Sequence, residues 1–151
     1  MEKTIHPSQV SGEVRPPCSK SYAQRALAAA LLCEGETTLS NIELCDDTRY
    51  AMDVITGLGA SVRQTGPAQY VIRGGLAPVT DTVNTGESGL ATRLFTPIAA
   101  LCERRMTVTG SGTMLRRPID MMIEPLRNLG AEVLSDGFLP ITVRGPLKGG
   151  E

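Results

Sequence analysis

Three short segments of the sequence place basic residues at the expected start of a helix, an arrangement that favours anion binding. The first runs from Pro16 to Ser21 (PPCSKS), and Arg25 follows about one helical turn after Ser21. The free backbone N–H groups and the dipole of a helix amino terminus attract negative charge. Lys20 at that end is unfavourable unless a negative group lies near it. The segment therefore predicts a small-anion site, and its plainer alternative is an N-cap at Ser19 beside a solvated lysine.

The second segment, Asn84 to Gly89 (NTGESG), precedes another expected helix, which contains Arg93. Glycines in such a turn let a ligand come close to the backbone. The alternative is a flexible turn that Ser88 caps, with Glu87 offsetting the helix dipole. Agreement with the first segment favours the anion-binding interpretation of this one over the flexible turn.

The third segment is Met114 to Pro118 (MLRRP). Pro118 fits the first position of a helix, which would put two arginines at the positive end of that helix. An arginine fork binds carboxylate or phosphate with two hydrogen bonds, and the alternative is a solvated pair. The corresponding helix start in the first half of the chain lies in Cys45 to Arg49, where Asp46 or Asp47 is predicted to cap the helix.

An internal repeat of about seventy residues is expected to position these segments. ALLCEG from residue 30 matches AALCER from residue 99, which is 69 residues later. GLGASV from residue 57 matches NLGAEV from residue 128, which is 71 residues later. The chain therefore contains two related units.

Each unit is predicted to have the order β-α-β-α-β-β, which makes the fold α/β (α+β). Helices are expected over 19–34 and 88–103, and a second helix in each unit ends at Gly59 or Gly130. Neither unit is expected to bury its sheet face alone, so the two should pack together. Strands are expected near Val14 and Val83, and over 37–42, 61–63, 70–73, 106–109, 132–134 and 141–144.

Composition excludes several classes of protein. The chain has 151 residues, 41% apolar and 21% charged, and a formal net charge of −1, so it is expected to be globular with no nucleic-acid or membrane surface. The polar, proline-interrupted first twenty residues do not fit a signal peptide and no apolar run reaches eighteen residues, which predicts a cytoplasmic location. Four cysteines without a CxxC pair and the single His6 predict no metal site.

The motifs PCSKSYAQRAL, NTGESGLATR and TMLRRPI, together with the repeat, resemble the enolpyruvyl transferases, and among them the 5-enolpyruvylshikimate-3-phosphate synthases. Members of that family have two domains, each built from three β-α-β-α-β-β units in an inside-out α/β barrel. The resemblance covers the whole chain but only the opening third or so of the family's length. The resemblance therefore implies that a third unit and the second domain are missing from this sequence.

The resemblance also predicts how the chain divides. Residues 1–151 correspond to part of the N-terminal domain, with a first unit over about 12–74 and a second over about 79–145. Residues 146–151 would begin a linker to the missing third unit. The expected macromolecular partner is the missing C-terminal part, or a second copy of the chain that covers exposed apolar surface.

The reaction that the resemblance implies is transfer of the enolpyruvyl group of phosphoenolpyruvate to the 5-hydroxyl of shikimate 3-phosphate, with release of phosphate. The reaction belongs to the shikimate pathway of aromatic amino-acid biosynthesis and needs no cofactor. Lys20 would be catalytic and lie between both substrates. Ser21 and Arg25 would bind shikimate 3-phosphate, while Gly89 and Arg117 would face phosphoenolpyruvate.

Two departures from the family pattern limit this transfer of roles. The glycine loop is longer than the commoner Asn-Ala-Gly-Thr-Ala-x-Arg form, so Gly86 could replace Gly89 as the residue that faces phosphoenolpyruvate, while Arg93 matches the loop's arginine. The family's Ser-Ser-Gln phosphate-binding motif and its second-domain acids are absent. The chain alone is therefore expected to be inactive.

Two other interpretations compete with this one. The related UDP-N-acetylglucosamine enolpyruvyl transferases usually have Lys-Asn where this chain has Lys20-Ser21, and they carry a reactive cysteine that is absent from residues 110–117. A non-catalytic module that binds small phosphorylated acids is the alternative from a different class.

Overall fold

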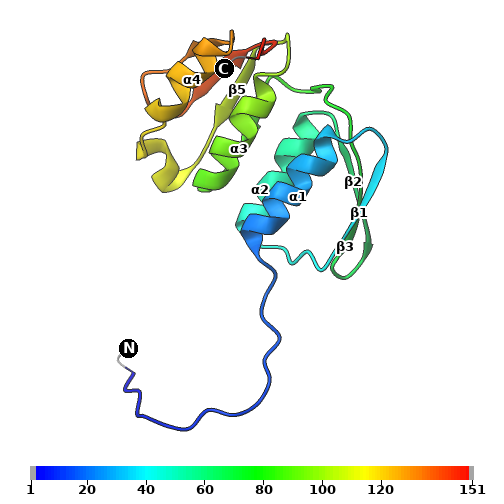
Figure 1. Ribbon diagram of the computed structural model, residues 1–151, viewed down its shortest axis with the longest axis vertical. Helices are drawn as coiled ribbons and strands as arrows, with labels where there is room; N and C mark the ends of the chain where they lie inside the picture. The colour runs from blue at the N-terminus through cyan, green and yellow to red at the C-terminus, as the bar shows by residue number, and fades with distance from the viewer. Residues whose placement is uncertain (1–2, 150–151) are drawn as a thin grey trace.

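The first half of the chain places two helices against a three-stranded antiparallel sheet (Figure 1). The computed structural model describes residues 3–149, so residues 150 and 151 of the predicted linker lie outside the described range. The strand order is β1-β3-β2. The elements of this half are α1 (Lys20–Leu32), β1 (Glu36–Ser40), α2 (Asp46–Gly57), β2 (Ser61–Gly66) and β3 (Gln69–Arg73).

The second half repeats this arrangement and adds a strand at the sheet edge. Its four strands have the order β4-β5-β7-β6, in which β4 runs parallel to β5 and the other pairs are antiparallel. The mixed α/β fold class is confirmed. The elements are β4 (Thr82–Asn84), α3 (Gly89–Ala99), β5 (Met106–Thr109), the 3-10 turns η1 (Gly112–Arg116) and η2 (Asp120–Met122), α4 (Ile123–Asn128), β6 (Glu132–Leu134) and β7 (Ile141–Arg144).

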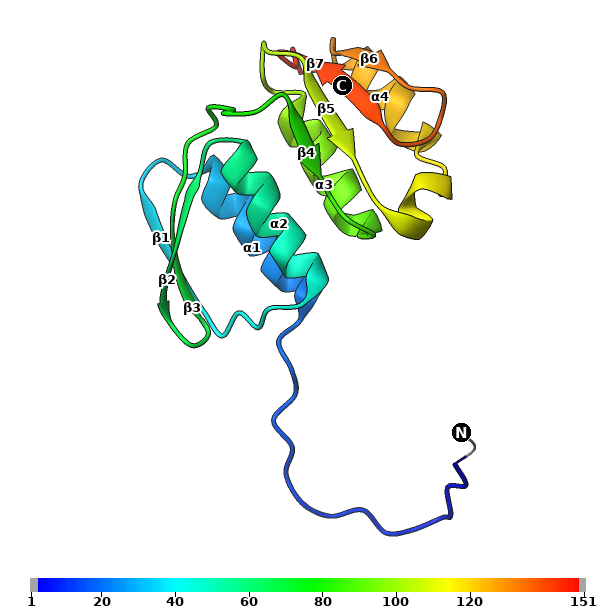
Figure 2. The same ribbon diagram turned by 180° about the vertical axis from the view of Figure 1, so that it is seen from behind.

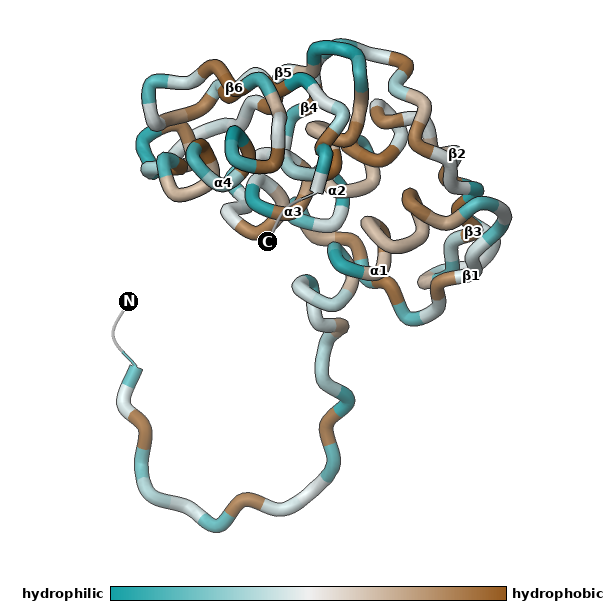
Figure 3. The backbone as a smooth tube through the Cα atoms, turned by 45° about the horizontal axis from the view of Figure 1, so that its top comes forward, coloured by the Kyte–Doolittle hydropathy of each residue, from teal (hydrophilic) through white to brown (hydrophobic). Residues whose placement is uncertain are grey.

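The strand expected near Val14 is not formed, which corrects that prediction. Residues 3–18 leave the body of the molecule as an extended segment without a strand (Figures 1 and 2). Val14 is 92% exposed, whereas Val83, its counterpart in the second half, is buried at 4% in β4. A strand forms where neighbours cover its side chains, and β4 gains that cover from α2 and β5. Figure 3 shows the segment as mostly hydrophilic, with single apolar positions between polar ones.

The helices begin and end close to the predicted positions. Ser19 caps α1, and the helix stops at Leu32 rather than at residue 34. Ser88 caps α3, which ends at Ala99, before the predicted residue 103. The glycines expected after the second helices, Gly59 and Gly130, have φ values of 114° and 94°, a region that glycine adopts without strain.

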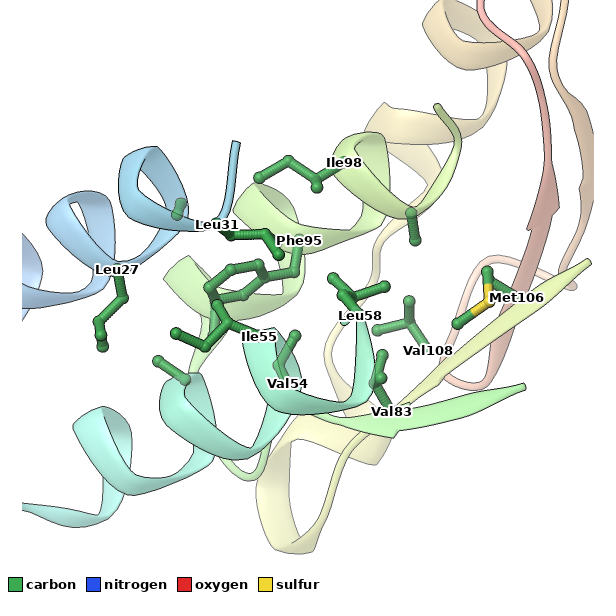
Figure 4. Close-up of a cluster of buried hydrophobic side chains, with 14 of the residues drawn as sticks. Leu27, Leu31, Val54, Ile55, Leu58, Val83, Phe95, Ile98, Met106 and Val108 are labelled. Atoms are coloured by element: carbon green, nitrogen blue, oxygen red, sulfur yellow. The ribbon is translucent and has the colours of Figure 1, made fainter. Parts of the chain in front are cut away.

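The core joins the two halves through the helices. Side chains from α1, α2 and α3 meet those of β4 and β5 in one apolar cluster (Figure 4). Phe95 of α3 is fully buried and lies among Leu31 and Ile55 of the first half. Burying a side chain of this size contributes about 1.5–3 kcal/mol. No helix within residues 3–149 combines the length and the apolar character that crossing a membrane would need.

Candidate functional site

Two helix amino termini, those of α1 and α3, open onto the same cleft. The Ser19 hydroxyl accepts a hydrogen bond from the Tyr22 N–H at 3.4 Å, and the Ser88 hydroxyl accepts one from the Ala91 N–H at 3.2 Å. Both serines are therefore N-caps. Each cap satisfies only one of the N–H groups at its helix end, so the others remain available to a ligand.

The cleft has a volume of about 400 Å³ and its lining is mainly polar. It brings together four of the five residues expected to bind substrates, and Arg93 joins them. The lining residues are Lys20, Ser21, Gln24, Asp47, Glu87, Ser88, Gly89, Leu90, Arg93 and Arg117.

Lys20 forms an ion pair across the cleft with Asp47, in the first turn of α2. The Nζ to Oδ2 distance is 2.8 Å, and the hydrogen bond and charge of Asp47 raise the pKa of Lys20 above its ordinary 10.5. Asp47 is therefore the negative group that a lysine at a positive helix end requires. The prediction that Asp46 or Asp47 caps α2 is wrong, because Cys45 has the extended backbone of the N-cap and its N–H donates to the Thr48 hydroxyl.

Arg117 reaches the cleft from the segment after η1, not from the start of a helix. The prediction that Pro118 begins a helix is wrong, since α4 starts only at Ile123. The reason lies at Ile119, whose side chain is fully buried and whose N–H donates to the Gly137 carbonyl at 2.8 Å. That contact holds Ile119 outside helical geometry.

Glu87 ties the glycine loop to η1. One carboxylate oxygen of Glu87 accepts hydrogen bonds from the N–H and the hydroxyl of Thr113, at 2.9 and 2.8 Å. The same hydroxyl accepts a hydrogen bond from Arg117 Nη2 at 3.3 Å. The two Thr113 bonds, with a smaller effect of the Arg117 charge, lower the pKa of Glu87 below 4.5. Glu87 therefore stays ionised and holds Thr113 and Arg117 beside the loop.

The two glycines left open by the sequence have different surroundings. Gly86 has a φ of 62°, and a β-carbon there would lie 2.2 Å from the Tyr50 ring. A β-carbon on Gly89 would instead lie 3.7 Å from Arg93 Nη2 and 3.8 Å from Arg117 Nη1. Gly86 is thus needed for packing, while Gly89 leaves open the space between two guanidinium groups.

Arg25 is the one expected substrate-binding residue that does not line the cleft. Its guanidinium folds back along α1, where Nη1 donates to the Ser21 carbonyl at 3.0 Å. Sequence reasoning gave no ligand-site role to Gln24 or Asp47. The signal for Gln24 was an amide inside an alanine- and leucine-rich helix, and the signal for Asp47 was the unpaired lysine at the start of α1.

The charges and free N–H groups of the cleft suit a small anion. Lys20, Arg93 and Arg117 line it, and Asp47 and Glu87 carry the opposing charges. Guanidinium groups and helix-end N–H groups bind phosphate and carboxylate oxygens with charge-assisted hydrogen bonds. The geometry can therefore hold a phosphorylated or carboxylated molecule between the two halves.

Two known proteins with similar sequences share a description. The 3-phosphoshikimate 1-carboxyvinyltransferase of Thermococcus kodakarensis is 39% identical over 145 residues, which are 94% of this chain and 34% of that protein. The protein with the same description from Rhizobium etli (strain CIAT 652) is 37% identical over 139 residues, 90% of this chain and 33% of that protein. The chain spans about a third of the length of these relatives.

Two solved structures show the same fold as this chain. The family is assigned from the sequence match. An EPSP synthase from Acinetobacter baumannii has a TM-score of 0.80 at 24% identity, over 90% of this chain and 32% of that one. The enolpyruvyl transferase NikO from Streptomyces tendae has a TM-score of 0.53 at 14% identity, over 85% of this chain and 30% of that one. Residues 5–151 match the family described as EPSP synthase (3-phosphoshikimate 1-carboxyvinyltransferase), and the chain belongs to that family.

Proposed function

We propose that this chain provides half of the substrate-binding surface of a 3-phosphoshikimate 1-carboxyvinyltransferase. The observation that carries the proposal is the cleft in which the amino termini of α1 and α3 meet Lys20 and Arg117. The reaction joins the enolpyruvyl group of phosphoenolpyruvate to the 5-hydroxyl of shikimate 3-phosphate. Protonation at C3 and attack of the hydroxyl at C2, with loss of the hydroxyl proton, give a tetrahedral intermediate, which then loses phosphate from C2 and a proton from C3 to restore the double bond.

Lys20 is the proposed catalytic residue because it lies where both substrates would meet. A lysine is positively charged at neutral pH even at its ordinary pKa of 10.5, and Asp47 raises the pKa of Lys20 further, so Lys20 can stabilise negative charge on either substrate and on the intermediate. Asp47 holds the ammonium group in place before a ligand arrives. A bound anion would then interact with the Lys20 ammonium group while Asp47 remains paired with it.

The two substrates are assigned to opposite sides of the cleft. Ser21 and Arg25 of α1 are proposed to bind shikimate 3-phosphate, while Gly89 and Arg117 of the second half are proposed to bind phosphoenolpyruvate. Arg25 must first release the Ser21 carbonyl. That bond is exposed to solvent, so its loss costs little.

Turnover is proposed to require more than this chain contains. The relatives are about three times as long as this chain. In the proposed division, the chain accounts for only part of one domain, which consists of a first unit (12–74), a second unit (79–145) and the start of a linker (146–151). The remaining binding groups, and the general acid and base, would come from residues equivalent to the part of the relatives that this chain does not match.

We also propose a cytoplasmic location, where this biosynthetic step would occur.

Titration of each substrate into the isotope-labelled chain tests the proposal. Shikimate 3-phosphate should give saturable amide shifts at Ser21 and Arg25, and phosphoenolpyruvate should give them at Gly89. Lys20→Ala should weaken both responses, whereas Lys148→Ala, a matched change outside the cleft, should not. The expected result is binding of both substrates without turnover. If neither substrate shifts these amides at millimolar concentration, the proposal that this chain binds the substrates is wrong.

A further inference from the structure

A chain of buried polar side chains runs inward from the wall of the cleft, where Gln24 and Ser88 lie, and Gln24 is its link to the first half of the protein. Gln24 lies on α1 and is 1% exposed. Its side-chain amide nitrogen lies 3.1 Å from the Ser88 hydroxyl oxygen, and its amide oxygen lies 3.4 Å from the same atom. A buried amide is costly unless hydrogen-bonded, so this contact determines how Gln24 is oriented.

The chain continues from Ser88 into the second half. Thr92 donates to the Ser88 carbonyl at 3.0 Å, and its hydroxyl lies 2.8 Å from that of Thr85. The Thr85 hydroxyl in turn lies 3.0 Å from the Thr109 carbonyl at the end of β5. Ser88, Thr92 and Thr85 are all at most 5% exposed. Hydrogen bonds thus connect α1, the start of α3 and the sheet without a solvent-exposed step.

Ser88 serves two purposes, which gives its contact with Gln24 a consequence for the cleft. Its hydroxyl caps α3 through the Ala91 N–H, and the next residue is Gly89, which lines the cleft. Moving Ser88 would therefore move the free N–H groups of α3. Gln24 lies one turn after Lys20 on α1, so its amide joins the two helix ends that border the cleft.

We propose that Gln24 is a positioning residue, which holds the amino terminus of α3 at the distance from Lys20 that the ligand needs. This inference rests on the proposed function. Apolar contacts already hold α1 and α3 together, since Leu31 and Phe95 are fully buried in the same core. Packing alone does not require an amide at position 24. An amide is required if the direction of the Ser88 hydroxyl matters.

Gln24→Met tests the proposal, because methionine has nearly the same length and shape but cannot replace the hydrogen bond. In the full ligand-free chain, hydrogen exchange at the Ala91 N–H should accelerate about three- to tenfold, the range that one hydrogen bond supports. Exchange at Ile55, inside α2, should stay within about twofold. Ser88→Ala should give the same acceleration, and the double variant should add little to it, as expected of coupled residues.

The ligand measurement separates positioning from general packing. For Gln24→Met, the Kd of phosphoenolpyruvate from the Gly89 shift should rise about three- to tenfold, while that of shikimate 3-phosphate from the Ser21 shift should change less than about twofold. Equal weakening of both ligands with faster exchange at Ile55 would overturn the proposal, as would unchanged exchange at Ala91. If the unaltered chain binds neither substrate, the proposed function fails, and the exchange result still decides the role of Gln24.

Discussion

At the scale of single residues, the site depends on where charge is held before a ligand binds. Lys20 stands at the positive end of α1 and is stabilised there by Asp47 at 2.8 Å. Gly89 leaves open the space in front of Arg93 and Arg117. The first arrangement maintains a cation and the second keeps room for an anion, so each can be tested by one substitution.

Asp47→Asn should lower the pKa of Lys20 toward its ordinary 10.5, because it removes the negative charge of Asp47 and leaves at most a weaker, neutral acceptor for the Lys20 hydrogen bond. The raised pKa stabilises the fold below the unfolded-state value, and this contribution disappears as the pH rises through the folded value. A pH titration of the Lys20 side chain by NMR checks this. Asp46→Asn is the matched control and should leave the Lys20 pKa unchanged.

Gly89→Ala should weaken phosphoenolpyruvate binding about fivefold or more, because the methyl group enters the space between the two guanidinium groups and overfilled sites cost about 1–3 kcal/mol. Shikimate 3-phosphate binding should change much less. Gly66→Ala is a suitable control, since its β-carbon would also make only ordinary contacts, the nearest at 3.5 Å from Gln69, but Gly66 does not line the cleft. Equal Kd values for phosphoenolpyruvate in both variants would contradict the assignment of Gly89.

At the scale of elements, the cleft depends on the connection between the glycine loop and η1. Glu87 contributes the acceptor, and Thr113 contributes both donors, one from its backbone and one from its side chain. Arg117 donates a hydrogen bond to the hydroxyl of the same threonine. The loop, η1 and Arg117 should therefore respond together when this contact is weakened.

Thr113→Val should raise the pKa of Glu87 toward 4.5, because only the backbone donor remains. A depressed carboxyl pKa stabilises the fold above the unfolded-state value, and this contribution is lost as the pH falls through the folded value. The variant should therefore lose less stability than the unaltered chain between neutral and acidic pH. Carboxyl-carbon NMR titration measures the pKa, and Thr65→Val, on β2, serves as the control.

At the scale of the whole molecule, the two halves share one core, so they should unfold together. Phe95 of α3 lies between helices of the first half and the sheet of the second. The cleft lies at the same junction, with α1 and α2 on one side and α3 on the other. Stability and site geometry therefore depend on the same contact.

Phe95→Ala should destabilise the protein by about 3–5 kcal/mol, the usual cost of removing a buried aromatic side chain. Urea unfolding followed by amide shifts in both halves should give a single lower midpoint, because the cavity affects both. Phe138→Ala is the control, since Phe138 is 41% exposed and its loss should matter little. Separate midpoints for the two halves would contradict the shared core.

Local patterns in the sequence were sufficient to predict most helices and strands, and to single out the basic residues that line the cleft. The repeat predicted the α/β fold, and Ser19, Ser88, Gly59 and Gly130 marked helix ends through hydrogen bonds and backbone angles that depend on near neighbours. The repeat predicted a leading strand in each unit, near Val14 and near Val83. Only the segment around Val83 is covered by other elements, and only that segment forms a strand.

The sequence by itself determined which residues could bind an anion, because charge and helix-start signals are local properties. Only the tertiary structure decided that Asp47 pairs with Lys20, that Arg117 follows η1, and that Gln24 reaches Ser88 across 64 residues of sequence. The contacts of Lys20 with Asp47 and of Gln24 with Ser88 join segments that are far apart in the chain. Their geometry is set by how α1, α2 and α3 pack, and no pattern of spacing within one segment encodes that packing.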